Sequence, residues 1–160
     1  MPAENTPEPS TPAAAAQTVA AVDASYLQTL LGYNARRVSL QVIEHFTEGM
    51  VAYGLTPVDF SVLSLIKHNP GITSRQLCNA LSLLPPNLVG KITLMEKRDL
   101  LVRKPHPDDG RAIGLYLTPG GRLMMQQAEK TATQLETDAS GKLTVAEAKT
   151  LLKLLQKIYL

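Results

Sequence analysis

One stretch constrains the fold of this chain more than any other, because residues 71–122 combine two helix starts with a short ribbon pattern. The first start is Thr73-Ser74, where either hydroxyl can accept a hydrogen bond from the first turn of a helix. The second is Pro85-Pro86, since proline is tolerated where the N–H groups have no helical partner. Apolar residues then recur at helical spacing and predict a helix to about Arg98. These residues are Leu88, Ile92 and Met95.

A pattern typical of a two-stranded ribbon follows the two helices. Residues 101–104 are predicted to be extended, and residues 105–111 form a loop rich in proline and glycine. Residues 113–117 then alternate apolar and other side chains, as strands do. Two helices followed by such a ribbon are the winged form of the helix-turn-helix. The predicted fold is therefore mainly α with a small β-wing.

Several runs in this stretch resemble the MarR family of transcriptional regulators. They are Leu77–Leu81, Pro85–Asn87, Met95–Leu101, and Asp109-Gly110-Arg111 with the later Leu117–Gly121. The Asp-x-Arg of the wing, followed by Leu-Thr-x-x-Gly, is the most distinctive run, and the resemblance extends from about Ser25 to the C-terminus. Two positions depart from the family pattern, since Gly110 and Gly90 stand where an arginine is common.

The resemblance implies a homodimer that binds double-stranded DNA through its winged units and dimerises through its terminal helices. It also implies a repressor that a small aromatic carboxylate releases from its operator. The two-fold symmetry of such a dimer predicts a near-palindromic operator with half-sites about one helical turn apart. A DNA-binding regulator without an effector and a winged helix that binds proteins remain alternatives, because fold does not fix function.

The chain divides by pattern into four regions, with helix-start signals at Thr56-Pro57, Thr118-Pro119 and Thr144. We expect a disordered tail (1–22), an N-terminal dimerisation helix (23–54), a winged helix-turn-helix (55–118) and C-terminal dimerisation helices (119–160). A single long helix is expected from Ser25 to about Gly49–Gly54. Leucines crowd the last ten residues, which favours a dimer interface over packing within one chain.

Composition restricts the class of protein further. A length of 160 residues suffices for one domain with a core, and the single cysteine, Cys78, excludes an intramolecular disulfide and is expected to be a small buried thiol. Neither a membrane-spanning run nor a basic N-terminal leader is visible, so we expect a cytoplasmic protein. The pattern contains no nucleophile–base pair, and the three histidines are too scattered for a metal site. We expect no enzymatic activity, no cofactor and no metal.

The expected DNA contacts follow from charge and from position on the predicted elements. Residues 71–122 carry eight basic and four acidic side chains, a net charge of +4 against −3 for residues 1–24. Asn87 is expected to bond an adenine edge or its own backbone, and Lys91 to reach guanine or phosphate, with Pro86 beside them. Ser74 and Arg75 are expected to contact phosphates.

The wing and the first long helix supply the remaining candidates. Arg111 is expected in the minor groove, held there by Asp109, with a solvated turn ion pair as the alternative. Arg103 is expected to attract phosphates. On the first helix, a planar carboxylate ligand is expected to meet Tyr33, Arg36, Arg37 and His45. Exposed or intersubunit polar contacts are the alternative for these four.

Overall fold

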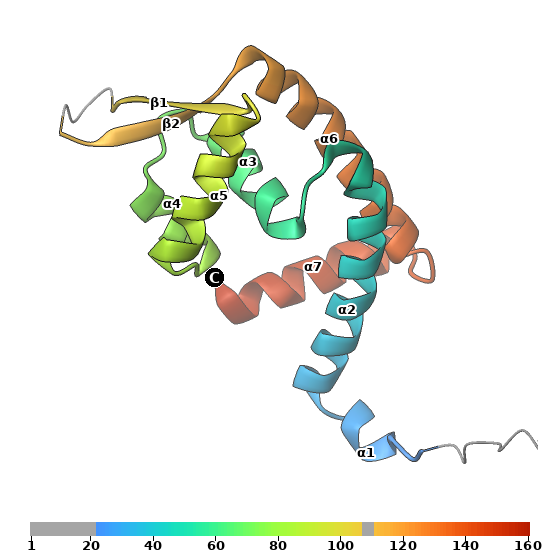
Figure 1. Cartoon of the computed structure of the whole chain (residues 1–160). Coiled ribbons are helices and arrows are strands. Elements are labelled where there is room, and N and C mark those ends of the chain that lie inside the picture. The colour runs from blue at the N-terminus through green and yellow to red at the C-terminus, as the bar shows by residue number, and fades with distance from the viewer. Residues whose placement is uncertain (1–21, 107–110) are drawn as a thin grey trace, which may run out of the picture.

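The computed structural model describes residues 22–106 and 111–160 (Figure 1). It consists of helices and one two-stranded antiparallel sheet, which confirms the predicted fold class. The elements are α1 (Ser25–Gln28), α2 (Leu31–Met50), the 3-10 helix η1 (Val51–Tyr53), α3 (Pro57–His68), α4 (Ser74–Leu81), α5 (Pro85–Lys97), β1 (Leu101–Pro105), β2 (Ile113–Leu117), α6 (Pro119–Ala139) and α7 (Val145–Tyr159). The tail expected at residues 1–22 lies almost wholly outside the described residues.

Threonine caps set the starts of four helices. Thr56, Thr73 and Thr144 each accept a hydrogen bond from a backbone N–H in the first turn, and a side chain in that turn accepts one back from the cap. Thr118 accepts from the N–H of Gly121 and so caps α6. The cap of α4 is Thr73, which decides between the two hydroxyls that the sequence offered.

The first helix is interrupted, so the single helix expected from Ser25 is wrong. α1 ends at Gln28, Leu30 is extended, and α2 begins at Leu31. The side-chain amide of Asn34 donates to the carbonyl oxygens of Gln28 and Leu30, both at 2.8 Å. The bond to Gln28 satisfies a carbonyl where α1 ends, whereas the Leu30 carbonyl also accepts the first backbone bond of α2, from the N–H of Asn34.

The wing is an antiparallel ribbon whose register runs from Leu101 opposite Leu117 to Pro105 opposite Ile113. A backbone bridge between Thr73 and Gly114 attaches this ribbon to the start of α4. A Cβ atom at Gly114 would lie 2.8 Å from the carbonyl oxygen of Gly71, so only glycine permits this approach. The ribbon is therefore attached to the helices through β2, close to its loop end, and residues 107–110 of the loop lie outside the described part.

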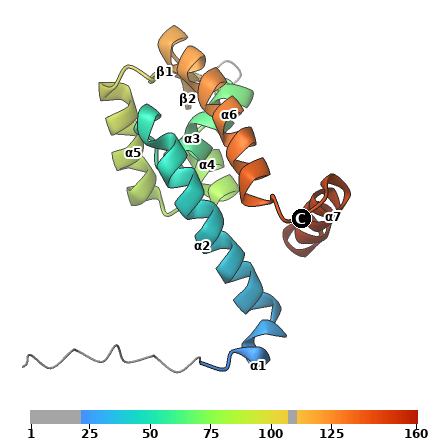
Figure 2. The same cartoon turned by 90° about the vertical axis from the view of Figure 1, so that its right-hand side faces the viewer.

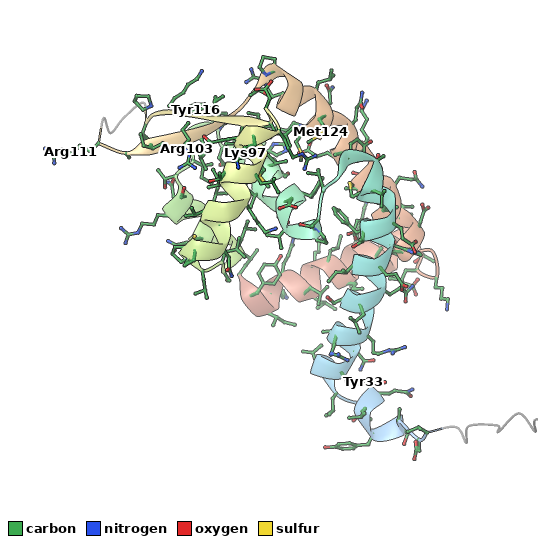
Figure 3. The ribbon with its side chains drawn as sticks, in the orientation of Figure 1. Tyr33, Lys97, Arg103, Arg111, Tyr116 and Met124 are labelled. Carbon is green, nitrogen blue, oxygen red and sulfur yellow. The ribbon has the colours of Figure 1, made fainter. Side chains whose placement is uncertain are left out.

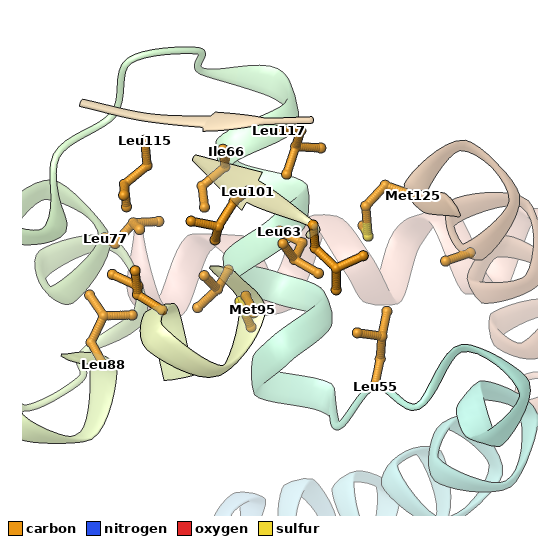
Figure 4. Close-up of a cluster of buried hydrophobic side chains, with 14 of the residues drawn as sticks. Leu55, Leu63, Ile66, Leu77, Leu88, Met95, Leu101, Leu115, Leu117 and Met125 are labelled. Atoms are coloured by element: carbon orange, nitrogen blue, oxygen red, sulfur yellow. The ribbon is translucent and has the colours of Figure 1, made fainter. Parts of the chain in front are cut away.

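The hydrophobic core lies inside the winged unit (Figure 4). It gathers the inner faces of α3, α4 and α5, the strands and the start of α6. Its fully buried side chains include Leu63, Ile66, Leu77, Leu88, Ile92, Met95, Leu101, Leu115 and Met125. Cys78 is a buried free thiol beside them, as the sequence predicts.

α2 and α6 run side by side, and each contributes to the core, through Met50 and Met125 (Figures 1 and 2). The hydroxyl groups of Tyr53 and Thr131 are 2.9 Å apart at this contact. Glu129 on α6 binds Lys67, Ser64 and His68 on α3. Burial by itself raises the pKa of Glu129, but the bonds from these three side chains outweigh it and lower the pKa.

The last helix, α7, departs from the rest of the molecule. Figure 2 shows it standing to one side of α2 and α6. Every residue of α7 is exposed except Ala148, which is half-buried. Packing of the last helix against its own chain, which the sequence left as an alternative, is thus wrong.

Two features are absent from residues 22–106 and 111–160. No single helix there is long and apolar enough to cross a membrane, and Leu31–Tyr53 with Pro57–His68 meets that test only as a pair bent by 67°. No group of three or more His, Cys, Asp or Glu side chains in these ranges is placed to hold a metal ion.

Candidate nucleic-acid interface

α4, α5 and the wing lie together at one end of the molecule, with the wing extending furthest (Figure 1). α5 packs on the core through Leu88, Ile92 and Met95 and exposes its opposite side. A helix held in this way by one face presents the other face to any surface that the molecule approaches. α5 is therefore the element that could enter a groove of DNA.

The outermost line of α5 follows from helix geometry. Successive residues are about 100° apart around a helix, so the line opposite the buried face carries residues 86, 90, 93 and 97. Pro86, Gly90, Thr93 and Lys97 are all exposed there. Pro86 is among the DNA contacts expected from the sequence, whereas Thr93 and Lys97 are not. The spacing of the three core residues would have found both.

Lys91 lies at the side of α5 and is half-buried. Its ammonium donates to Oδ1 of Asp59 on α3 at 2.8 Å, and Asp59 is itself buried at the first turn of that helix. Burial tends to raise the pKa of Asp59, but bonds from Lys91 and Thr56 hold it below its ordinary value. Lys91 thus fixes α5 to α3, and its contact with DNA stays a prediction.

The other expected contacts on α4 and α5 are accessible to different degrees. Asn87 is exposed in the first turn of α5, and Arg75 is exposed in the first turn of α4. Ser74 is half-buried and begins α4 directly after its cap. These placements bring three candidates to the helix starts, where unpaired backbone N–H groups also favour anions.

Two arginines at the base of the wing are engaged within the chain. Arg103 on β1 forms a bidentate pair with Glu96 on α5, its Nε lying 3.0 Å from each carboxylate oxygen. Arg98 donates to the carbonyl oxygens of Gly54 and Tyr53 at 2.8 and 2.7 Å. Arg103 therefore positions the wing against α5, and phosphate attraction by its remaining N–H groups stays a prediction.

The outer part of the wing carries the other basic residues. The ammonium of Lys104 lies 5.7 Å from the centre of the Tyr116 ring, which is close enough for a cation–π contact. Arg111 is exposed at the far end of the wing (Figure 3). Asp109, expected to hold Arg111, lies outside the described residues.

The four candidates for ligand binding are not brought together within one chain. Arg36 and His45 are nine residues apart, which places them on opposite sides of α2 and about 13 Å apart along its axis. Tyr33 lies at the end of the molecule opposite the wing (Figure 3). Ligand binding by these four residues therefore stays a prediction.

A second surface consists of apolar side chains on α7 and on α1–α2. On α7, Leu152 is 57% exposed and Ile158 is 64% exposed, and both lie on the same side as Leu151, Leu155 and Tyr159. On α1 and α2, Tyr26, Leu31 and Val38 are 74%, 63% and 53% exposed. Apolar faces of this extent usually have a partner.

Comparisons with known proteins agree with this geometry. The sequence profile of the MarR family matches residues 53–112, from η1 into the wing. An HTH-type transcriptional repressor of Mycobacterium tuberculosis is 23% identical over 80% of this chain and 92% of its own length.

Solved structures are similar over most of their length. The transcriptional repressor CouR, bound to a 23-mer DNA duplex, is 35% identical with a TM-score of 0.79, covering 86% of this chain and 98% of that one. CouR bound to p-coumaroyl-CoA is 34% identical with a TM-score of 0.74, covering 86% and 97%. MarR from E. coli, in its apo form, is 26% identical with a TM-score of 0.71, covering 82% and 98%.

Proposed function

This chain belongs to the MarR family of transcriptional regulators, and from that premise we propose that it is a dimeric repressor released from its operator by an aromatic acyl-CoA. The observation that carries the proposal is the exposed outer face of α5, held beside a basic wing and covered by no other part of the described chain. We place its action in the cytoplasm, where chromosomal DNA is accessible, and propose no catalytic role.

The apolar faces of α7 and α1–α2 support assembly as a two-fold dimer. A dimer built from these faces carries two copies of α5 related by the same axis. Major grooves on one face of B-DNA recur about every 34–36 Å, so both helices bind at once only to half-sites near that spacing. This requirement makes a near-palindromic operator the expected partner.

The proposed effector class rests on similarity to CouR and on the chemistry of α2. CouR has been solved with p-coumaroyl-CoA, which combines an aromatic acyl group with several phosphates. Tyr33 offers a ring for stacking, and the exposed Arg36 and Arg37 offer guanidinium groups that pair well with phosphate. An effector bound there weakens DNA binding only if it binds better to a dimer whose α5 helices miss the groove spacing.

The test starts from a duplex that the full chain selects out of a random DNA library. Addition of p-coumaroyl-CoA should release the protein from this duplex, whereas CoA alone or p-coumarate should not at equal concentration. Arg37→Gln should raise the concentration needed for release about tenfold or more, which corresponds to the loss of one charge-assisted bond. Its DNA affinity without effector should stay unchanged. Fluorescence anisotropy of the labelled duplex measures both quantities.

Each other outcome identifies one of the rival functions. Selective binding that p-coumaroyl-CoA leaves unchanged would contradict the proposed effector and leave a DNA-binding regulator. Failure to select any sequence, together with a flat dependence of random-DNA binding on salt, would contradict DNA binding altogether. A protein that neutralises phosphates must show a steep negative slope in that titration.

The wing supplies a second test of DNA binding. Arg111→Ala should weaken binding to the selected duplex by about 1–3 kcal/mol, because one groove contact is lost while the fold stays intact. Lys142→Ala, in the exposed loop between α6 and α7, removes a positive charge far from the wing and serves as the control. Equal affinity for Arg111→Ala and Lys142→Ala in a gel-shift titration at fixed salt would exclude the wing from the interface.

A further inference from the structure

The middle of α5 contains a glycine that nothing in the described chain requires. A Cβ atom built at Gly90 meets no atom within 4 Å, whereas one at Gly114 or Gly121 would overlap the backbone. Glycine inside a helix costs about 0.5–1 kcal/mol relative to alanine. Gly90 therefore lowers helix stability without improving packing inside the chain, and on the outer line of α5 it leaves the helix backbone open to a close approach from outside.

Apolar side chains flank Gly90 on both sides of the outer line. Val89 is 56% exposed, Leu94 is 54% exposed, and Pro86 is exposed one turn earlier. An exposed leucine or valine is unremarkable alone, but here two of them border the helix face that points away from the core. The central part of this face thus offers methyl and methylene groups to whatever it meets.

The polar side chains near this centre already have partners. The hydroxyl of Thr93 donates to the carbonyl oxygen of Val89 at 3.0 Å, and the ammonium of Lys91 is bound to Asp59. Asn87 and Lys97 lie nearer the two ends of the helix. A helix presenting such a surface to the major groove has few hydrogen-bonding groups with which to read base edges.

We propose that α5 selects its half-site largely by contact with the C5-methyl groups of thymine, through Val89 and Leu94. This inference rests on the proposed DNA-binding function and adds the base that the helix recognises. Thymine is the base that presents an apolar group in the major groove, and apolar side chains are its usual partners. Gly90, between the two, lets the helix backbone approach the base edges closely enough for both contacts.

The experiment uses the duplex selected by the full chain, with each thymine replaced in turn by deoxyuridine. Deoxyuridine keeps every Watson–Crick hydrogen bond and removes only the methyl group. Replacing a thymine that α5 contacts should lower the affinity of the protein for the duplex about fourfold, which is the effect of one buried methyl-sized group. Thymines outside the two half-sites should show no loss.

A protein variant then tests whether α5 makes the contact. Val89→Thr keeps the shape of the side chain and replaces one methyl with a hydroxyl. The affinity of this variant should therefore differ less between the thymine and the deoxyuridine duplex at one position per half-site. Val51→Thr makes the same change at a residue of η1 that is 72% exposed, and it should leave that preference unchanged. Circular dichroism confirms that both variants keep their helices.

The possible outcomes distinguish thymine recognition from the proposed DNA-binding function. If no duplex is selected over random DNA, the proposed function fails. If selection succeeds but every deoxyuridine duplex binds as tightly as its parent, thymine-methyl recognition is excluded while the function stands. Deoxyuridine could also weaken binding equally for Val89→Thr and for the unchanged protein. In that case the thymine methyl does not contact Val89, and the assignment is overturned.

Discussion

Leu152→Glu and Leu155→Glu in α7 should each convert the protein from a dimer into a monomer. A carboxylate that is buried without a partner costs several kcal/mol, and a two-fold interface contains two copies of it. The dimer dissociation constant should therefore rise more than about a thousandfold. Sedimentation velocity over a range of protein concentrations measures this change. The monomer should also bind the selected duplex only at its non-specific level, because it presents a single α5.

Thr150→Glu is the matched control for this change. Thr150 lies on the opposite side of α7 from Leu152 and Leu155, and its substitution adds the same single negative charge. We expect that variant to remain a dimer with unchanged affinity for the duplex. A stable dimer for both leucine variants would show that α7 lies outside the interface. Circular dichroism distinguishes a folded monomer from an unfolded chain.

Gly121→Ala should destabilise the fold strongly, because an added Cβ there has a shorter backbone contact than at any other glycine compared among the described residues. The backbone of Gly121 lies against the carbonyl group of Leu100, and an added Cβ would overlap its oxygen and lie 2.9 Å from its carbon. The same oxygen accepts a hydrogen bond from the N–H of Thr118, so it cannot move freely. The overlap must be relieved by shifting α6 away from the wing, at about 3 kcal/mol or more.

The neighbouring glycine provides the control within the same helix turn. A Cβ atom at Gly120 would meet only Oγ1 of Thr118 at 3.8 Å, which is an ordinary contact. Gly120→Ala should leave the free energy of unfolding unchanged or raise it by about 0.4–1 kcal/mol, since alanine restricts the unfolded chain. Urea unfolding of both variants at fixed protein concentration measures the difference. Equal midpoints for the two would contradict the packing role of Gly121.

Interactions between residues close in sequence determine much of this structure without any tertiary contact. The caps at Thr56, Thr73, Thr118 and Thr144 start four helices through bonds within four residues. Prolines follow two of these caps, Thr56 and Thr118, and prolines also begin α5, and none of them needs a distant partner. Alternation in residues 113–117 gave the second strand correctly. Such signals are readable because the interacting groups are close in sequence. The family resemblance at Asp109-Gly110-Arg111 likewise lay in a short run.

Tertiary structure decided where the side chains of the site point and what they bind. Lys91 appeared free in the sequence, yet it is bound to Asp59, 32 residues earlier, because α3 and α5 pack on the same core. Arg103 likewise binds Glu96 across the junction between wing and helix. The interruption before α2 is bridged by bonds from the side chain of Asn34, and the apolar spacing carried no sign of it. The partner of a charged group depends on the distances between helices and strands. Helical periodicity in the sequence does not predict these distances.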